Sequence, residues 1–316
     1  MVEKQHKGEI TFGALALGTW TFAGDDIWSS SEESDCIRVI HSALDQGIKL
    51  FDTSPNYGNG RSEVLLGKAL QGRLDALVAD KLKIDGLGPD EIRLQVERSL
   101  TILGREQIDL MQIHWPSMEP GENLAALELF SRMQEEGKIR ALGVCNFGVY
   151  DLEECRDINL ISNQLAYNLA WRPVEEHIVP ACRKRDMKIW AYSPLQQGLL
   201  TGQYEHLTDF PAGRQRTRHY KDLQNAVQEM LSAFIDFCRR QDLNPTATAL
   251  RYIWSGSQAD TVLAGARNTE QLSQLIEISQ ESDLPEDIME ELNRLSEPLR
   301  LETGGNPDMY QSRVRY

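Results

Sequence analysis

Short apolar runs alternate with longer amphipathic stretches along the whole chain, and the two pair as strands with helices. The predicted strands are Ala14–Gly18, Lys49–Thr53, Leu77–Lys81, Ile108–His114, Ala141–Asn146, Leu160–Leu165, Lys188–Ser193 and Thr261–Gly265. The predicted helices are Ser31–Gln46, Ser62–Gln71, Pro89–Leu103, Asn123–Glu136, Val149–Cys155, Val174–Arg185, and Leu223–Gln241 with Thr246–Ser255. Strands and helices in alternation predict parallel βαβ units.

Residues at the expected boundaries agree with these helices. Ser31 and Ser62 stand where helix N-caps belong. Three glycines, Gly47, Gly104 and Gly137, follow predicted helix ends, where the backbone often turns left-handed. Repeated strand–helix pairs without a break in composition predict an α/β fold, a single (β/α)8 TIM barrel spanning residues 1–316.

A doubly wound sheet is the competing fold. Its dinucleotide fingerprint is missing, because the nearest match, residues 58–63, has Glu63 at the third glycine position. The length of 316 residues also suits a barrel, which commonly needs about 250. Two segments fall outside the repeat: a long polar loop at 201–222, expected to border a cofactor, and an extra helix Leu284–Ser296 with a tail Glu302–Tyr316.

Composition and charge exclude several classes of function. The formal net charge of −15 disfavours nucleic acid and anionic membranes as partners. Five cysteines, with no C-x-x-C, predict reduced thiols rather than a disulfide framework or a metal site. No apolar run approaches the roughly 18 residues of a membrane span, and Met1–Lys7 has no apolar core of a secretory signal. We expect a soluble, cytoplasmic protein.

Four residues with usable chemistry follow the ends of consecutive predicted strands. Asp52, Lys81 and His114 stand at these ends, and Tyr57 lies in the loop after Asp52. Barrel enzymes place their sites there. A tyrosine can protonate a carbonyl oxygen, a lysine can stabilise the phenolate, a carboxylate can hold the lysine, and a neutral histidine can orient the carbonyl.

Each of the four residues also has an ordinary structural explanation when taken alone. A strand-end aspartate often caps a helix, a loop tyrosine often packs, a strand-end lysine is often solvated, and a histidine between apolar neighbours is often a core residue. Their coincidence at one predicted barrel mouth favours carbonyl chemistry.

Longer motifs in chain order resemble the aldo-keto reductase family. The run Phe51–Gly67 is similar to the signature around the family's catalytic Asp and Tyr. Glu97–Gly104 with Ile108–Pro116 resembles the signature that ends in its catalytic His. Further matches are Gly137–Phe147, Asn163-Gln164 and Ala191–Gly202. The resemblance covers about Phe12 to Ser296 and is strongest to bacterial members near the potassium-channel β-subunit and inositol-operon reductases.

Carried over position by position, the resemblance implies a role for each matched residue. Tyr57 would be the proton donor, Lys81 its pKa modulator, Asp52 the partner of the lysine, and His114 the group that orients the carbonyl. Residues implied to bind or border the cofactor are Gly18, Thr19, Asn146, Gln164, Tyr192, Ser193, Leu195, Gly198, Thr201, Arg267 and Gln271. Trp20, Trp115 and Trp171 are candidates for the walls of an aromatic substrate pocket.

The chain departs from the family pattern at three places. Asp80 stands where the family usually has Thr before its lysine, Cys145 where it has Ser, and Gln274-Leu275 where a Glu-Asn pair is common. Lys83 lies on the same strand face as Lys81, so alternation cannot choose between them, and the family pattern favours Lys81.

The predicted function is reduction of small aldehydes or ketones by hydride transfer. The cofactor is expected to be NADP(H) rather than NAD(H), because Arg267 precedes a predicted helix start and could bind the 2′-phosphate. A redox-sensing regulatory subunit that binds NADP(H) with slow turnover is the alternative, since such proteins keep the same four residues. A Schiff-base enzyme would need Lys81 as its nucleophile.

Overall fold

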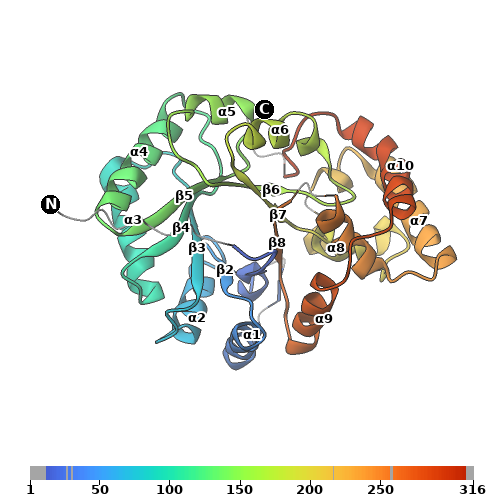
Figure 1. Ribbon diagram of the computed structural model, residues 1–316, viewed down its shortest axis with the longest axis horizontal. Coiled ribbons are helices and arrows are strands. Elements are labelled where there is room, and N and C mark those ends of the chain that lie inside the picture. The colour runs from blue at the N-terminus through green and yellow to red at the C-terminus, as the bar shows by residue number, and fades with distance from the viewer. Residues whose placement is uncertain (1–11, 26–27, 30, 216, 257–258, 311–316) are drawn as a thin grey trace.

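Eight parallel strands close into a barrel in which each strand pairs with the next and β8 pairs with β1 (Figure 1). The strands are β1 Leu15–Gly18, β2 Leu50–Asp52, β3 Leu77–Leu82, β4 Ile108–Ile113, β5 Ile139–Cys145, β6 Ser162–Ala166, β7 Lys188–Tyr192 and β8 Thr261–Ala264. All eight lie within two residues of the predicted bounds. The single-domain (β/α)8 prediction is confirmed.

Helices surround the barrel (Figure 1). They are α1 Glu33–Asp45, α2 Arg61–Ala69, α3 Pro89–Leu103, α4 Glu122–Glu135, α5 Val149–Glu154, α6 Ile178–Arg183, α7 Gln224–Arg240, α8 Pro245–Ser255, α9 Thr269–Ser279 and α10 Glu286–Thr303. Both α7 and α8 lie between β7 and β8, and α10 packs beside α7. Short 3-10 turns η1 Thr19–Phe22, η2 Pro173–Glu175, η3 Gln196–Thr201, η4 Leu207–Asp209, η5 Ala212–Arg214 and η6 Arg218–Tyr220 complete the connections.

This computed structural model describes residues 12–25, 28–29, 31–215, 217–256 and 259–310. The predictions for Met1–Lys7 and for residues 311–316 of the tail fall outside these ranges. Within them, no helix is long and apolar enough to cross a membrane. The same part of the chain holds no group of three or more His, Cys, Asp or Glu side chains that could bind a metal ion. All five cysteines are free and buried.

Two of the predicted helix caps are wrong. Helix α1 begins after Glu32 and α2 after Gly60, so neither Ser31 nor Ser62 is an N-cap. Ser62 lies inside α2 and is buried, with its hydroxyl 2.8 Å from that of Thr53. The three glycines after helix ends do turn left-handed, with φ of 92° at Gly47, 64° at Gly104 and 82° at Gly137.

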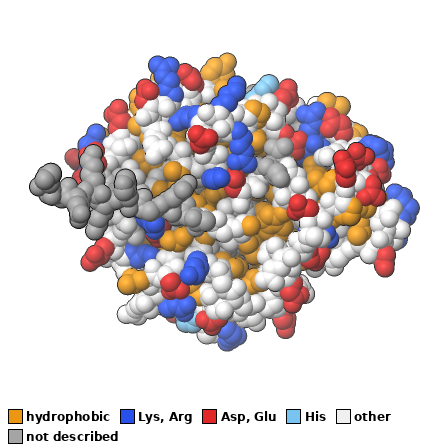
Figure 2. All heavy atoms as spheres, viewed as in Figure 1, with side chains coloured by type: hydrophobic (Ala, Val, Ile, Leu, Met, Phe, Trp, Pro, Cys, Tyr) orange, Lys and Arg blue, Asp and Glu red, His pale blue; other side chains and the backbone are white. Residues whose placement is uncertain are grey.

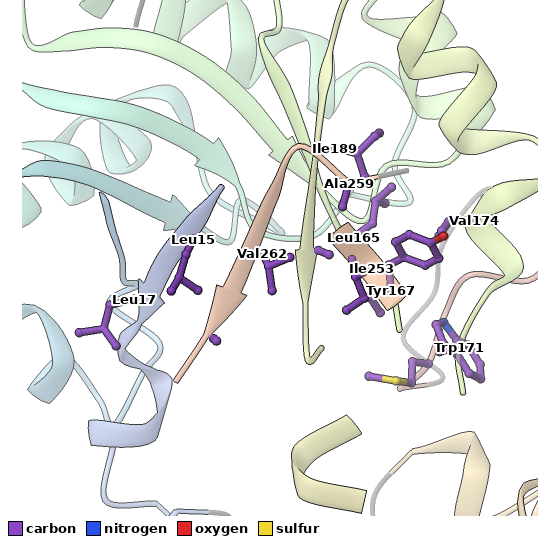
Figure 3. Close-up of a cluster of buried hydrophobic side chains, with 14 of the residues drawn as sticks. Leu15, Leu17, Leu165, Tyr167, Trp171, Val174, Ile189, Ile253, Ala259 and Val262 are labelled. Atoms are coloured by element: carbon purple, nitrogen blue, oxygen red, sulfur yellow. The ribbon is translucent and has the colours of Figure 1, made fainter. Parts of the chain in front are cut away.

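Alternation along the strands divides the buried residues into two groups. Alanine and leucine side chains and one tryptophan fill the barrel interior: Ala16, Leu50, Ala79, Leu110, Ala141, Trp190 and Leu263. The residues between them point outward to a larger shell against the helices; Figure 3 shows Leu15 and Leu17 of β1 near Val262 of β8 in that shell.

Polar residues on the inward positions therefore gather at the end where the strands finish. Asp52, Lys81 and Gln164 keep the inward parity of Leu50, Ala79 and the other interior residues. On the molecular surface, side chains of both charge signs are interspersed over the face shown in Figure 2, with hydrophobic side chains gathered toward its centre. The closed barrel thus brings these three polar side chains together at one end, where Lys81 and Gln164 both donate to Asp52.

Candidate active site

A cavity of about 1110 Å³ opens at the carboxyl ends of the strands. Its lining includes the predicted residues Gly18, Asp52, Tyr57, His114, Asn146, Gln164, Tyr192, Ser193, Leu195, Gly198, Thr201, Arg267 and Gln271. Catalytic candidates come from β2, β4 and the loop after β2, and cofactor candidates come mainly from β5 to β8. The cavity therefore has two sides that meet over the middle of the barrel.

A buried ion pair lies at the floor of this cavity. The Lys81 Nζ atom donates to Asp52 Oδ2 at 2.7 Å and to the Thr53 carbonyl oxygen at 2.7 Å. Gln164 Nε2 donates to the other oxygen, Asp52 Oδ1, at 2.8 Å. Burial opposes the charge on Lys81, but the Asp52 carboxylate outweighs it and holds the pKa of Lys81 above its ordinary value. Lys81 is thus an ammonium at neutral pH.

Tyr57 lies directly over this ammonium. Lys81 Nζ is 4.7 Å from the centroid of the Tyr57 ring. Burial raises the pKa of Tyr57 above its ordinary value, while the charge of Lys81 opposes that rise. The next residue, Gly58, fixes the loop: its φ is 59°, and a Cβ there would lie 2.0 Å from the Ala23 carbonyl oxygen. The phenol is therefore protonated at neutral pH and is held in place by the backbone behind it.

His114, directly after β4, faces Tyr57 from two strands along the barrel. The two rings lie 5.7 Å apart at 82°. Burial and the charges of Lys81 and Lys83 lower the pKa of His114 well below its ordinary value, so the imidazole is neutral. The Ser54 hydroxyl lies 3.2 Å from His114 Nδ1. When Ser54 donates this bond, the ring proton resides on Nε2, which is then a donor.

Two amides and a phenol form the boundary between the two sides of the cavity. Asn146 Nδ2 donates to the His114 carbonyl oxygen at 3.2 Å, and Tyr192 donates to Asn146 Oδ1 at 2.9 Å. Asn146 adopts a left-handed φ of 61°, which turns its side chain over the mouth. Gln164 spends its amide donor on Asp52, so its carbonyl oxygen is the group it can offer to a ligand.

The far side of the cavity has features suited to phosphate. Gly198 has a φ of 101°, a conformation that L side chains rarely adopt, and the Thr201 hydroxyl donates to its carbonyl oxygen at 2.7 Å. Arg267 precedes α9, where Asn268 caps the helix by accepting from the Gln271 backbone N–H at 2.8 Å. Arg267 Nη2 donates to the Ser29 hydroxyl at 2.8 Å, whereas its Nε is buried without a hydrogen-bond partner among the described residues.

The structure corrects two predicted positions. Thr19 is fully buried and is not among the lining residues; its hydroxyl donates to the Asp52 carbonyl oxygen at 2.8 Å and lies 2.5 Å from the hydroxyl of Ser62, so the side chain faces α2. Trp171 is also fully buried, with its indole N–H donating to the Pro307 carbonyl oxygen at 3.2 Å. Trp20 and Trp115 do line the cavity. Trp20 stacks on Tyr57 at 6.1 Å between centroids.

Sequence reasoning missed several lining residues. Arg214 of η5 lies 4.5 Å over the ring of Trp28, a contact between a long loop and the segment after β1. Tyr310 of the tail accepts from Gln197 Nε2 at 2.9 Å, and its ring lies 6.1 Å from that of Trp115. These residues belong to irregular segments, where no periodic pattern signals a position.

Comparisons with known proteins agree with this geometry. A family model described as Aldo/keto reductase family matches residues 14–297. The aldo-keto reductase YhdN of Bacillus subtilis (strain 168) is 34% identical over 287 residues, covering 85% of this chain and 86% of that protein. The NADH-specific methylglyoxal reductase of Escherichia coli (strain K12) is 31% identical over 296 residues, covering 84% and 89%.

Solved structures give the same result for the fold. The glycerol dehydrogenase of Gluconobacter oxydans superposes with a TM-score of 0.79 at 29% identity, over 98% of both chains. An aldo-keto reductase of Klebsiella pneumoniae in complex with NADPH superposes with a TM-score of 0.73 at 21% identity, over 96% of this chain and 95% of that one. At that lower identity the likeness shows the fold alone.

A pair of buried acidic side chains lies behind the site, on the outward face of β3. Asp80 points away from the cavity toward α2, where Glu63 is also buried. Asp80 Oδ2 and Glu63 Oε1 have no hydrogen-bond partner among the described residues, although Ser99 reaches both carboxyl groups. Burial, followed by the charge of Glu63, raises the pKa of Asp80 to about 8. The folded protein therefore keeps a proton on this pair at neutral pH.

We predict that Asp80→Asn stabilises the protein increasingly as the pH rises. The folded wild type holds a proton that the unfolded chain has released above about pH 4. The stability contributed by that proton is fully present below that pH and is lost as the pH rises to about 8. The Tm difference between Asp80→Asn and wild type should grow from pH 5 to pH 8 and then level off. Asp157→Asn, at a side chain 90% exposed, is the control. A Tm difference that does not change with pH contradicts the protonated pair.

Proposed function

This chain belongs to the aldo/keto reductase family, and we propose that it reduces small aldehydes or ketones to alcohols with NADPH and with Tyr57 as proton donor. The observation that carries the proposal is the convergence of four groups at the cavity floor. A protonated phenol, a charged lysine held by a buried carboxylate, and a neutral histidine lie within contact of one another.

Tyr57 supplies the proton in this mechanism. Its phenol carries a proton at neutral pH because burial raises the pKa of Tyr57. As the carbonyl oxygen gains negative charge, the proton passes from the phenol to that oxygen. The Lys81 ammonium beneath the ring then stabilises the phenolate that remains. Asp52 fixes the ammonium in position and accepts hydrogen bonds from both Lys81 and Gln164.

His114 orients the carbonyl oxygen beside Tyr57. A neutral imidazole with its proton on Nε2 donates a hydrogen bond without competing for the transferred proton. The Ser54 hydroxyl lies 3.2 Å from Nδ1 and favours that tautomer when it donates to this nitrogen. Trp20 and Trp115 limit the side of the cavity on which the carbonyl compound would lie.

The residues on the other side fit a nicotinamide dinucleotide. A bound reduced nicotinamide supplies the hydride. Gln164 and Asn146 present amide groups that suit a carboxamide, and the Tyr192 ring, half-buried at the boundary, suits an aromatic face. Ser193, Leu195 and the Gly198–Thr201 backbone would hold the pyrophosphate, with Gly18 lining the mouth. The unpartnered Arg267 Nε and the amino-terminal end of α9 suit a phosphate.

NADPH is proposed over NADH because of Arg267. The 2′-phosphate of NADPH carries nearly two negative charges, and a guanidinium at a helix start can bind it. The helix α9 begins two residues after Arg267, and Gln271 on it accepts from the Arg267 backbone N–H at 2.9 Å. The name of the Escherichia coli relative, an NADH-specific reductase, makes NADH the competing cofactor.

The charge on Lys81 argues against a Schiff-base mechanism, since the nucleophile there must be a neutral amine. A redox-sensing regulatory subunit would have the same site. It would differ from an enzyme by its slow turnover of carbonyl compounds. We also propose a cytoplasmic location and no nucleic-acid partner, supported by the five free thiols and the net charge of −15.

The first test of the function removes the proton donor. Tyr57→Phe keeps the ring against Trp20 but cannot give a proton, so carbonyl reduction should slow by about 10²–10⁴-fold. NADPH affinity, measured by fluorescence titration, should be nearly unchanged. Tyr150→Phe, at an exposed tyrosine on α5, is the control. Half of the wild-type rate remaining in Tyr57→Phe would show that another group supplies the proton.

A second test concerns the charged lysine. Lys81→Met should abolish reduction, because the phenolate loses its stabilising charge. This variant leaves Asp52 buried and unpaired, so the double variant Asp52→Asn/Lys81→Met should restore the Tm without restoring activity. Lys184→Met, at an exposed lysine after α6, is the matched control for both assays. Activity that returns together with the Tm would mean that Lys81 is needed for folding and not for the reaction.

Cofactor choice gives the third test. Arg267→Ala should raise the KM for NADPH several-fold and leave the KM for NADH nearly unchanged, because NADH has no 2′-phosphate. Arg294→Ala, at an exposed arginine on α10, is the control. Equal losses for the two cofactors, or a wild-type preference for NADH, would show that Arg267 does not recognise the phosphate.

A further inference from the structure

Lys83 lies at the edge of the cavity on the side of Tyr57 and His114. It follows β3 directly, and the His114 backbone N–H donates to the carbonyl oxygen of the preceding residue, Leu82, at 2.8 Å. Leu82 is buried in the shell against the helices, whereas Lys81 and Lys83 share the opposite parity. Lys81 is fully buried beneath the cavity, where it pairs with Asp52, and Lys83 lines the cavity wall nearer the solvent.

The ammonium of Lys83 is not engaged by the protein. Among the residues that the structure describes, it has no ion pair and no hydrogen-bond partner. The other two lining cations of the described chain are engaged: Arg214 over Trp28 and Arg267 with Ser29. Both of those lie toward the proposed cofactor side. Lys83 is thus the free cation on the proposed substrate side.

Two of the four carboxylates that line the cavity near its rim already accept hydrogen bonds from other residues. Asp25 accepts from the Trp20 indole N–H at 3.1 Å and from the Trp28 backbone N–H at 2.8 Å, and Glu122 accepts from the Ser117 hydroxyl at 2.5 Å. Asp85 and Glu119 remain as exposed acidic side chains of the rim. The charge of Lys83, in contrast, reaches the centre of the site, where it helps to lower the pKa of His114.

Aromatic side chains line the same cavity as Lys83. Trp20, Trp115 and Tyr310 line this part of the cavity, with the Trp115 and Tyr310 rings in edge contact. Such walls suit an apolar or aromatic body. These features suit a substrate in one orientation. Its carbonyl group would lie at the floor beside the neutral His114, its apolar body between the aromatic rings, and an anionic group at the rim beside Lys83.

We propose that Lys83 is a specificity-determining residue that binds a carboxylate on the substrate, at the end opposite the carbonyl group. The substrate class is then an apolar or aromatic aldehyde that also carries a carboxylate. This inference rests on the proposed carbonyl reduction and adds to it the charge of the compound that is reduced.

The test compares two aldehydes that differ in charge. With wild-type enzyme and NADPH, kcat/KM for 4-carboxybenzaldehyde should exceed that for its methyl ester by roughly fivefold, the upper end of what an exposed ion pair contributes. Lys83→Met should lose this ratio through a higher KM for the acid, and Lys83→Arg should keep most of it. Lys184→Met should keep the wild-type ratio. Added salt should reduce the ratio in wild type, Lys83→Arg and Lys184→Met, and should not change it in Lys83→Met.

Several results would overturn the proposal. One is an unchanged acid-to-ester ratio in Lys83→Met; another is a wild-type preference for a trimethylammonio-substituted benzaldehyde, which would assign recognition to Asp85 and Glu119. In both, reduction of the ester still proceeds, so the proposed function would stand while the role of Lys83 fails. If no aldehyde is reduced with either cofactor, the proposed function fails and this inference fails with it.

Binding without turnover provides a second readout. In wild type, benzoate should bind more tightly than benzamide, as measured by quenching of the fluorescence of Trp20 and Trp115. Lys83→Met should remove that difference in affinity. Equal affinity of wild type and Lys83→Met for benzoate contradicts the proposal, whatever the kinetics show.

Discussion

The site depends on the burial of one ion pair, Lys81 with Asp52. Two charges removed from water carry a large desolvation penalty, which is offset only when geometry is good and the remaining donors and acceptors are used. Here they are used: Lys81 also donates to the Thr53 carbonyl oxygen, and Gln164 donates to Asp52. The barrel makes this possible by placing β2, β3 and β6 around one interior.

Burial and the charge of that pair together set the protonation states above it. A charged Lys81 stabilises a phenolate on Tyr57 but, by the same field, disfavours a charge on His114. Burial acts in the other direction on Tyr57 and keeps the phenol protonated until a reaction draws the proton away. The acid Tyr57, the stabilising cation Lys81 and the neutral donor His114 thus owe their states to one buried charge pair and to burial in the cavity.

Much of this arrangement could be predicted from the sequence because barrel geometry follows from strand periodicity. Strand ends mark the mouth, and inward parity alone groups Asp52 with Lys81. Parity also explains why Asp80, which departs from the family pattern, lies outside the site. It precedes Lys81 on β3, so its side chain points to the opposite face, toward α2. The same reasoning failed where irregular backbone determines the position of a side chain. Thr19 in η1 faces α2, and Trp171 is buried against the tail. Arg214 and Tyr310 reach the cavity from segments without a periodic pattern.

The pH dependence of the chemical step tests the account most directly. If Tyr57 stays protonated, His114 neutral and Lys81 charged, the single-turnover rate of carbonyl reduction by the NADPH-loaded enzyme should be constant from about pH 7 to about pH 9.5, since the pKa of His114 is lowered from 6.5 and that of Tyr57 is raised from 10.0. A rate that falls with an apparent pKa near 8 in both wild type and Asp80→Asn would show that a group at the cavity floor changes its charge in the neutral range, and would contradict the roles derived for the buried pair.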